Sequence, residues 1–256
     1  MELAFRKYGQ GQTLLILHGL FGQSDNWATL AKKFAENGFE VYTIDQRNHG
    51  LSPHSDEWNY EVMAEDIKEF IETHQLKKPI LLGHSMGGKV AMFFALQYKD
   101  VLDRLIVVDI APRAYAPHHN EVLNALTAVD FNTINTRKEA EEIMLSYLPD
   151  YGTRQFLLKN IYWADNADKR MNWRFNLNII HKKYDAIGVE APHKTNTLKT
   201  LFIRGGKSDY IKDEDLSDIE KRFPNYELTT ISESGHWVHA EKPEEFYQAV
   251  TSFITA

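Results

Sequence analysis

The amino-acid sequence predicts an α/β fold, in which a mostly parallel, twisted sheet is flanked by helices and carries an inserted helical cap. Short apolar runs alternate with segments of helical periodicity up to residue 110, and again from residue 198 onward. Such alternation is typical of parallel strands joined by right-handed crossovers. Between these parts, residues 112–196 contain no apolar run typical of a buried strand. This interruption is too long to be a loop, and it therefore predicts the cap.

The length and amino-acid composition are those of a soluble globular protein. The 256 residues are enough for one large α/β domain with an inserted subdomain. Hydrophobic residues make up 43% and charged residues 25%, which is typical of soluble globular proteins. The net charge is −7 and no basic stripe is present, which argues against a nucleic acid partner. The chain has no cysteine, which excludes disulfides, thiolate metal sites and a cysteine nucleophile.

Neither a signal peptide nor a membrane span is expected. Residues 1–8 lack the apolar core of a signal peptide, and no run approaches the ~20 apolar residues of a membrane span. We therefore expect a cytoplasmic protein. The sequence does not indicate an oligomeric state.

The first elements follow in order. Residues 13–17 form an apolar run that predicts a strand buried on both faces. Residues 25–36 have helical spacing, and Asn37 and Gly38 are expected to end that helix. Residues 39–44 predict the next strand, and the amphipathic residues 60–74 predict a helix.

The remaining elements surround the cap. An apolar run at residues 79–82 precedes a helical pattern at residues 89–96, and residues 105–108 predict another buried strand. After the cap, we expect strands at residues 198–203 and 226–231 and helices at residues 213–222 and 243–254. The predicted α/β core domain therefore comprises residues 1–111 and 197–256, and the predicted cap comprises residues 112–196.

The cap itself is predicted to be helical. Its helical segments are expected around residues 118–129, 136–147 and 152–160. The stretch is rich in large aromatic side chains, among them Trp163 and Trp173. These aromatics fit either a hydrophobic wall for a substrate or the core of the cap itself.

The pentapeptide Gly83-His84-Ser85-Met86-Gly87 lies between a predicted strand and a predicted helix. A serine on such a tight turn is forced outward, with its hydroxyl exposed at the end of the sheet. A Cβ atom at position 83 or 87 would clash, because the turn brings strand and helix together. The helix also points its N-terminal amides at the same place. Ser85 is therefore the predicted nucleophile.

A serine nucleophile needs a base and an orienting acid. His236 is the predicted base, because it follows the last predicted strand and Gly235 allows its loop a close approach to Ser85. Two carboxylates follow strand ends, where ligands of open α/β sheets bind. Asp209 follows a predicted strand and precedes His236, as the chain order serine, acid, histidine requires. It is slightly favoured as the acid, and Asp109 stays a close alternative.

The oxyanion hole is predicted from backbone amides. One donor is the amide of Met86, directly after the nucleophile. The second is expected from the loop after the first buried strand, most naturally at Leu20, since Gly19 and Gly22 allow that loop to turn sharply. Phe21, His84 and Trp237 are the further candidates for lining a substrate pocket.

Taken in order, these motifs resemble the α/β-hydrolase superfamily over essentially the full length. The motifs on which this resemblance rests are His18-Gly19, Asp45-x-Arg47-x-x-Gly50-x-Ser52, Gly83-x-Ser85-x-Gly87, Gly206-x-x-Asp209 and Gly235-His236. The segments around Leu20, Asn48, Lys89, Ala111 and Trp237 are similar to the bacterial YbfF-type esterases and their mitochondrial abhydrolase relatives. The resemblance implies the α/β-hydrolase fold and a cytoplasmic carboxylesterase or acyl-thioester hydrolase. It also implies that the residue at Asp109 can serve as the acid.

The predicted function is therefore a serine hydrolase that cleaves small-molecule esters or acyl thioesters through an acyl-enzyme on Ser85, with no metal and no organic cofactor. Carbon–carbon bond hydrolases and cofactor-free haloperoxidases use the same triad and stay as alternatives. A catalytically silent ligand-binding protein on the same fold is the alternative from another class.

Overall fold

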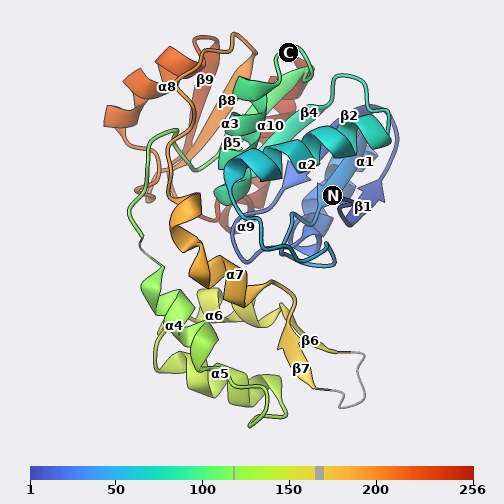
Figure 1. Cartoon of the computed structure of the whole chain (residues 1–256). Helices are drawn as coiled ribbons and strands as arrows, with labels where there is room; N and C mark the ends of the chain where they lie inside the picture. Colours follow the sequence, from blue (N-terminus) through green and yellow to red (C-terminus); the bar gives the residue numbers. More distant parts are fainter. Residues whose placement is uncertain (118, 165–169) are drawn as a thin grey trace.

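A seven-stranded sheet forms the centre of the computed structural model, which describes residues 1–117, 119–164 and 170–256 (Figure 1). The strand order is β1-β3-β2-β4-β5-β8-β9, and every pair is parallel except the antiparallel pair β1–β3. The strands span β1 Phe5–Tyr8, β2 Gln12–Leu17, β3 Phe39–Ile44, β4 Ile80–His84, β5 Arg104–Val108, β8 Thr200–Gly205 and β9 Tyr226–Ile231. The predicted fold class, a mostly parallel sheet flanked by helices, is confirmed.

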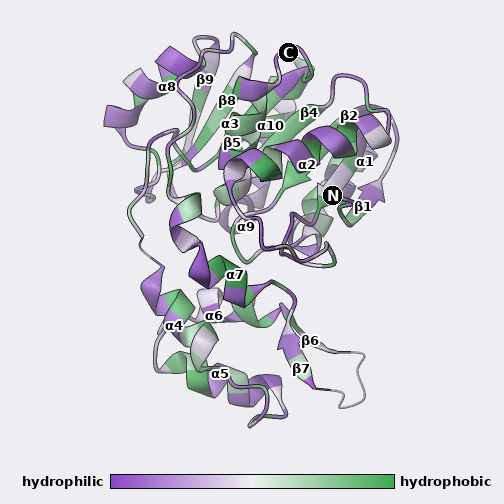
Figure 2. Ribbon diagram, viewed as in Figure 1, coloured by the Kyte–Doolittle hydropathy of each residue, from purple (hydrophilic) through white to green (hydrophobic). Residues whose placement is uncertain are grey.

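Helices cover both faces of this sheet. The main ones are α1 Ala28–Glu36, α2 Tyr60–Thr73, α3 Met86–Gln97, α8 Leu216–Arg222 and α10 Pro243–Thr255. Alternate residues of β2 point to opposite faces, so that Leu14 and Ile16 pack with α1 and α10, while Leu15 and Leu17 pack with α2, α3 and α8. The inner strands carry hydrophobic residues on both faces (Figure 2). This double burial explains why their sequences read as continuous apolar runs.

The inserted segment forms a separate layer over one end of the sheet (Figure 1). Its elements are α4 Asn120–Ala128, α5 Arg137–Leu145, α6 Tyr151–Leu158, β6 Ile161–Trp163, β7 Met171–Trp173 and α7 Leu177–Lys182. Trp173 stacks on Phe175 and meets Phe131 edge-on, and both Trp173 and Phe175 are buried. These aromatics therefore form the core of the cap, whereas Trp163 is 61% exposed. Residue 118 of the predicted first cap helix lies outside the described residues.

Several short elements were not predicted. The edge strand β1 is mostly exposed, so it lacks the apolar run of a buried strand. Strands β6 and β7 form an antiparallel pair and have three residues each. Strands this short show no clear alternation of apolar and polar residues. Helix α7 has six residues, and α9 Val238–Glu241 has four. Within the described ranges, no helix has the length and apolar character needed to cross a bilayer.

Candidate active site

Ser85 lies on the turn between β4 and α3. Its backbone adopts φ 53° and ψ −117°, a strained conformation for a residue with a side chain. A Cβ atom at Gly83 would lie 2.1 Å from the Gly87 carbonyl oxygen, and one at Gly87 would lie 2.6 Å from the His18 carbonyl oxygen. Both glycines are thus required sterically, as the sequence predicted. The turn projects Ser85 from the carboxyl end of a central strand.

The imidazole of His236 joins Ser85 to a carboxylate. The Ser85 hydroxyl lies 2.9 Å from His236 Nε2, and His236 Nδ1 lies 2.8 Å from Asp109 Oδ2. In the neutral tautomer that fits both contacts, Ser85 Oγ–H donates to Nε2 and Nδ1–H donates to the carboxylate. The three side chains come from turns after β4, β5 and β9. The fold therefore brings His236 together with two residues that lie more than a hundred positions earlier in the sequence.

Asp109, rather than Asp209, is the carboxylate beside His236. Asp109 is fully buried, and its oxygens also accept hydrogen bonds from the Gly205 amide at 2.9 Å and the Ser208 hydroxyl at 2.5 Å. The Asp209 side chain is 93% exposed, with Lys212 Nζ at 3.4 Å. The geometry thus corrects the slight preference for Asp209. The loop after β8 turns Asp209 outward, whereas Asp109 has a positive φ of 50° and faces that loop.

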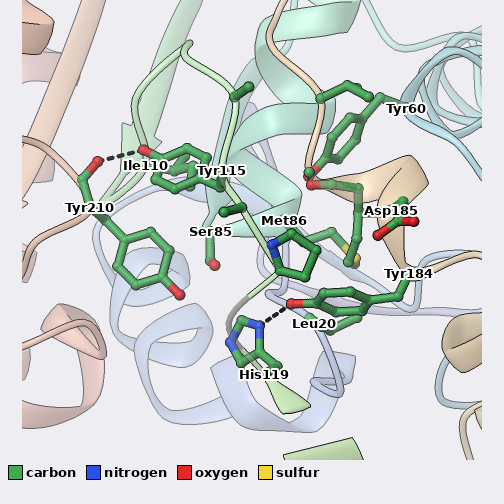
Figure 3. Close-up of a pocket in the computed structure, with 16 residues that line it drawn as sticks. Leu20, Tyr60, Ser85, Met86, Ile110, Tyr115, His119, Tyr184, Asp185 and Tyr210 are labelled. Atoms are coloured by element: carbon green, nitrogen blue, oxygen red, sulfur yellow. Dashed lines mark hydrogen bonds between the residues drawn. The ribbon is translucent and has the colours of Figure 1, made fainter.

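The loop after β2 passes directly over Ser85. A Cβ atom at Gly19 would lie 3.3 Å from the Ser85 Cβ, and the Gly22 amide donates to the Gly19 carbonyl at 2.9 Å to close a tight turn. Leu20 and Met86 line the same cavity as Ser85 (Figure 3). The two residues expected to supply oxyanion donors therefore lie beside the hydroxyl.

Comparison with known proteins decides the family. The sequence profile described as the alpha/beta hydrolase fold matches residues 12–142. The chain belongs to the α/β-hydrolase family. An sn-1-specific diacylglycerol lipase, ABHD11 of Mus musculus, is 39% identical over 94% of the chain and 80% of its own length. Esterase YbfF of Escherichia coli is 35% identical over 94% of the chain and 92% of its own length.

A solved structure of this α/β-hydrolase family is also similar. The structure titled "Marine microorganism esterase" has 41% sequence identity and a TM-score of 0.95, and the match covers 98% of the chain and 99% of that structure. The resemblance to YbfF-type esterases and their abhydrolase relatives, predicted from the ordered motifs, is confirmed.

Two buried histidines of this α/β-hydrolase, His18 and His49, hold the loop after β2. The sequence analysis gave His18 only as part of a family motif and predicted this role for neither residue. The Gln46 amide donates to His18 Nε2 at 3.0 Å, and the Phe21 amide donates to His49 Nε2 at 3.1 Å. Burial lowers the pKa of His18 to about 4 and that of His49 to about 3. Both rings are therefore neutral at pH 7, so each Nε2 keeps the lone pair that accepts the amide.

The three predicted pocket residues occupy different places in the hydrolase site. Phe21 is buried against Phe175 of the cap, with ring centroids 4.9 Å apart. Trp237 packs on Phe156 of α6, with centroids 5.9 Å apart. His84 is buried, and its Nε2 lies 2.8 Å from the His236 carbonyl oxygen. All three predicted residues line one cavity beside Ser85.

Two aromatic residues of this hydrolase were missed by the sequence analysis. The Tyr210 ring stacks on the His236 ring, with centroids 3.8 Å apart and planes 19° apart. His119 lines the cavity near Ser85 and contacts the Tyr184 hydroxyl through Nδ1 (Figure 3). The position of Tyr210 directly after Asp209 in a strand-end loop is the signal that could have identified it.

No metal site accompanies these groups in residues 1–117, 119–164 and 170–256, where no set of three or more His, Cys, Asp or Glu side chains could hold an ion. The polar groups of the hydrolase site are instead those of acyl transfer: a hydroxyl, an imidazole, a carboxylate and backbone amides. Groups of this kind can form and break a covalent bond with an acyl group.

Proposed function

We propose that this carboxylesterase-type hydrolase cleaves small-molecule esters through an acyl-enzyme formed on Ser85. The observation that carries the proposal is the pair of hydrogen bonds that links Ser85 Oγ through His236 to Asp109, at 2.9 and 2.8 Å. Relatives named esterase or lipase at 35–40% identity confirm the predicted class of serine ester hydrolase.

Acylation begins with Ser85. His236 Nε2 takes the hydroxyl proton as Ser85 Oγ attacks the ester carbonyl carbon. The Asp109 carboxylate holds the correct tautomer of His236 and stabilises the imidazolium that forms. The carbonyl oxygen becomes an oxyanion, and we assign its two hydrogen-bond donors to the backbone amides of Leu20 and Met86. One such donor contributes about 3 kcal/mol to the stability of a transition state of this kind.

Deacylation repeats these steps with water. The imidazolium gives its proton to the leaving alcohol, which departs, and a water molecule takes its place beside His236. His236 then deprotonates the water as it attacks the acyl carbon, and Ser85 leaves with the proton returned. Acyl thioesters react by the same sequence, and they remain in the proposed substrate class.

The other predicted activities are less well supported. A carbon–carbon bond hydrolase or a haloperoxidase would use the same three side chains, but the two relatives named above, at 39% and 35% identity, carry the names lipase and esterase. A silent binding protein has no need of a strained serine in contact with an oriented imidazole. A cytoplasmic location stays a prediction, which fractionation of the native cells would test.

The test uses a fluorophosphonate probe together with a series of p-nitrophenyl esters and acyl-CoA thioesters. We expect the folded protein to be labelled at Ser85, and ester turnover to disappear in Ser85→Ala. A folded protein without label on Ser85, or a Ser85→Ala variant with unchanged turnover, would overturn the proposal. Acyl-CoA turnover above ester turnover would assign the thioester as the substrate.

A further inference from the structure

Two separate cavities meet at Ser85. One has a volume of about 340 Å³ and the other of about 250 Å³. Among the residues that the structure describes, four line both cavities, namely Leu20, Ser85, His119 and Tyr210. Because an ester has one substituent on each side of its reacting group, two cavities at one nucleophile raise the question of which substituent each one holds.

The first cavity, here called the Tyr60 cavity, extends between α2, α3 and the returning end of the cap (Figure 3). Besides Tyr60 itself, Met86, Ile110, Tyr115 and Ile187 line it, whereas His236 does not. The hydroxyls of both tyrosines are already used, because Tyr60 donates to the Ile187 carbonyl at 2.7 Å and Tyr115 donates to the Tyr210 carbonyl at 2.5 Å. The walls therefore present mainly apolar surface to a ligand.

The second cavity, here called the Trp237 cavity, lies between the loop after β2, the loop that carries His236, and helices α4 and α6. His236 and Trp237 line it together with Val122 and Phe156 of the cap. It also holds more polar groups, among them Asn26 and Thr153. Water and an alcohol can both form hydrogen bonds with these polar groups.

Proton transfer decides between the cavities. As the bond from Ser85 Oγ to the carbonyl carbon forms and the bond from that carbon to the ester oxygen breaks, the proton held on His236 Nε2 passes to the departing oxygen. That oxygen must therefore lie within hydrogen-bond reach of Nε2. His236 lines only the Trp237 cavity.

We infer that the Tyr60 cavity binds the acyl chain and that the Trp237 cavity binds the alcohol and later the attacking water. This assignment rests on the proposed acyl-enzyme mechanism. Among the described residues, no lysine or arginine lines either cavity. The Tyr60 cavity therefore fits a neutral, apolar acyl chain rather than one that ends in a carboxylate, as in the half ester of a dicarboxylic acid. Ile187 is thus a determinant of acyl specificity and Val122 a determinant of alcohol specificity.

A matched pair of cap variants tests the assignment. Ile187 and Val122 are β-branched and partly buried, and each lines one cavity only. Ile187→Trp is expected to lower kcat/KM for p-nitrophenyl octanoate relative to p-nitrophenyl acetate by at least ~10-fold, since apolar pockets discriminate by about that factor per methylene. Ile187→Ala should shift the same ratio in the opposite direction.

Val122→Trp is expected to leave that acyl ratio unchanged and to lower kcat/KM for octyl butyrate relative to methyl butyrate. Leu145→Trp, at an exposed position of α5, serves as the control for adding a tryptophan to the cap. Thermal melting of each variant shows whether it is folded. p-Nitrophenyl butyrate should also react faster than the p-nitrophenyl half ester of succinate in the parent protein.

Burst kinetics give an independent readout. Hydrolysis of the acyl-enzyme involves the acyl chain and water but no alcohol group. The ratio of the deacylation rates of the octanoyl-enzyme and the acetyl-enzyme should therefore change in Ile187→Trp and stay the same in Val122→Trp. If Val122→Trp shifts the acyl ratio and Ile187→Trp shifts the alcohol ratio, the assignment is overturned. The assignment is also overturned if both variants shift the same ratio to the same extent. Loss of the proposed function itself would look different, because ester turnover would then survive Ser85→Ala.

Discussion

The imidazole of His84, next to the nucleophile, donates its Nε2–H to the carbonyl oxygen of His236 at 2.8 Å. Burial lowers the pKa of His84 well below its usual range, so the ring stays neutral at pH 7. The carbonyl can only accept, which fixes the tautomer with its proton on Nε2. The turn that carries Ser85 therefore also holds the loop that carries the proposed base.

His84→Phe should lower kcat for p-nitrophenyl acetate by about 10-fold, because loss of one orienting contact loosens the geometry on which catalysis depends. The phenyl ring keeps the shape but has no N–H to donate. His84→Gln, which retains an N–H donor, should recover part of the loss. His181→Phe, at an exposed position of α7, is the control. Equal activities of the phenylalanine and glutamine variants would contradict an orienting role.

Exchange of each aspartate for asparagine separates the two carboxylates. Asp109→Asn should lower kcat by about 10³–10⁴-fold, because the amide favours the wrong tautomer of His236. Asp209→Asn should leave kcat within about 2-fold, since its carboxylate is 93% exposed and pairs with Lys212. Steady-state kinetics of both variants give the answer, and the reverse pattern would restore Asp209 as the acid.

The sequence was sufficient to predict six of the seven strands of the sheet, the turn at Ser85 and the position of His236 after the last strand. These features depend on local pattern, because buried strands require apolar runs and the turn requires glycines at 83 and 87. The choice between Asp109 and Asp209 could not be made in this way. Both follow strand ends, and the outcome depends on the backbone at Asp109, whose φ of 50° follows from the surrounding tertiary structure.

The surroundings of the site were the least predictable part. Tyr210 stacks on His236 only because the loop after β8 meets the loop after β9, which no periodicity encodes. His49 reaches the Phe21 amide across 28 residues of sequence. Contacts of this kind come from tertiary packing, so a single sequence gives residue types but not their partners.

Buried neutral histidines predict loss of stability in acid. Burial lowers the pKa of His18 to about 4 and that of His49 and His239 to about 3. The unfolded chain binds these protons near pH 6.5, so between pH 6.5 and 4 it holds more protons than the native state. Stability must then fall as the pH falls, by about 2 kcal/mol per histidine at pH 5. Urea unfolding at pH 7.5 and pH 5 measures this loss.

His239→Phe isolates one of these protons. The His239 ring stacks on Trp27, with centroids 4.0 Å apart, and its buried Nδ1 has no hydrogen-bond partner in the described ranges. Phenylalanine keeps the stacking and cannot be protonated. The variant should therefore lose about 2 kcal/mol less than the parent between pH 7.5 and pH 5. Identical pH dependence in the two proteins would show that His239 does not carry the effect.

Lys89→Met should loosen the connection between cap and sheet. Lys89, on α3, is 1% exposed, and its Nζ donates to the carbonyls of Pro112, Arg113 and Val189 at 2.6–2.9 Å. These carbonyls belong to the two crossings where the chain leaves the sheet and returns from the cap. One donor group therefore holds both crossings beside the helix that follows Ser85.

The substitution removes this donor from three carbonyls. The Pro112 carbonyl keeps its hydrogen bond from the Ala191 amide at 2.7 Å, whereas the Arg113 and Val189 carbonyls lose the lysine. A buried carbonyl left unpaired costs about 1–3 kcal/mol. We expect urea unfolding to show a loss of at least ~2 kcal/mol, and limited trypsin digestion to cut faster at Arg113 and Lys183. Lys99→Met removes an exposed lysine just beyond the end of the same helix and should change neither measurement. Because the cap lines both cavities at Ser85, ester turnover should fall in Lys89→Met even where the variant remains folded. Unchanged digestion and turnover would mean that packing alone holds the crossings in place.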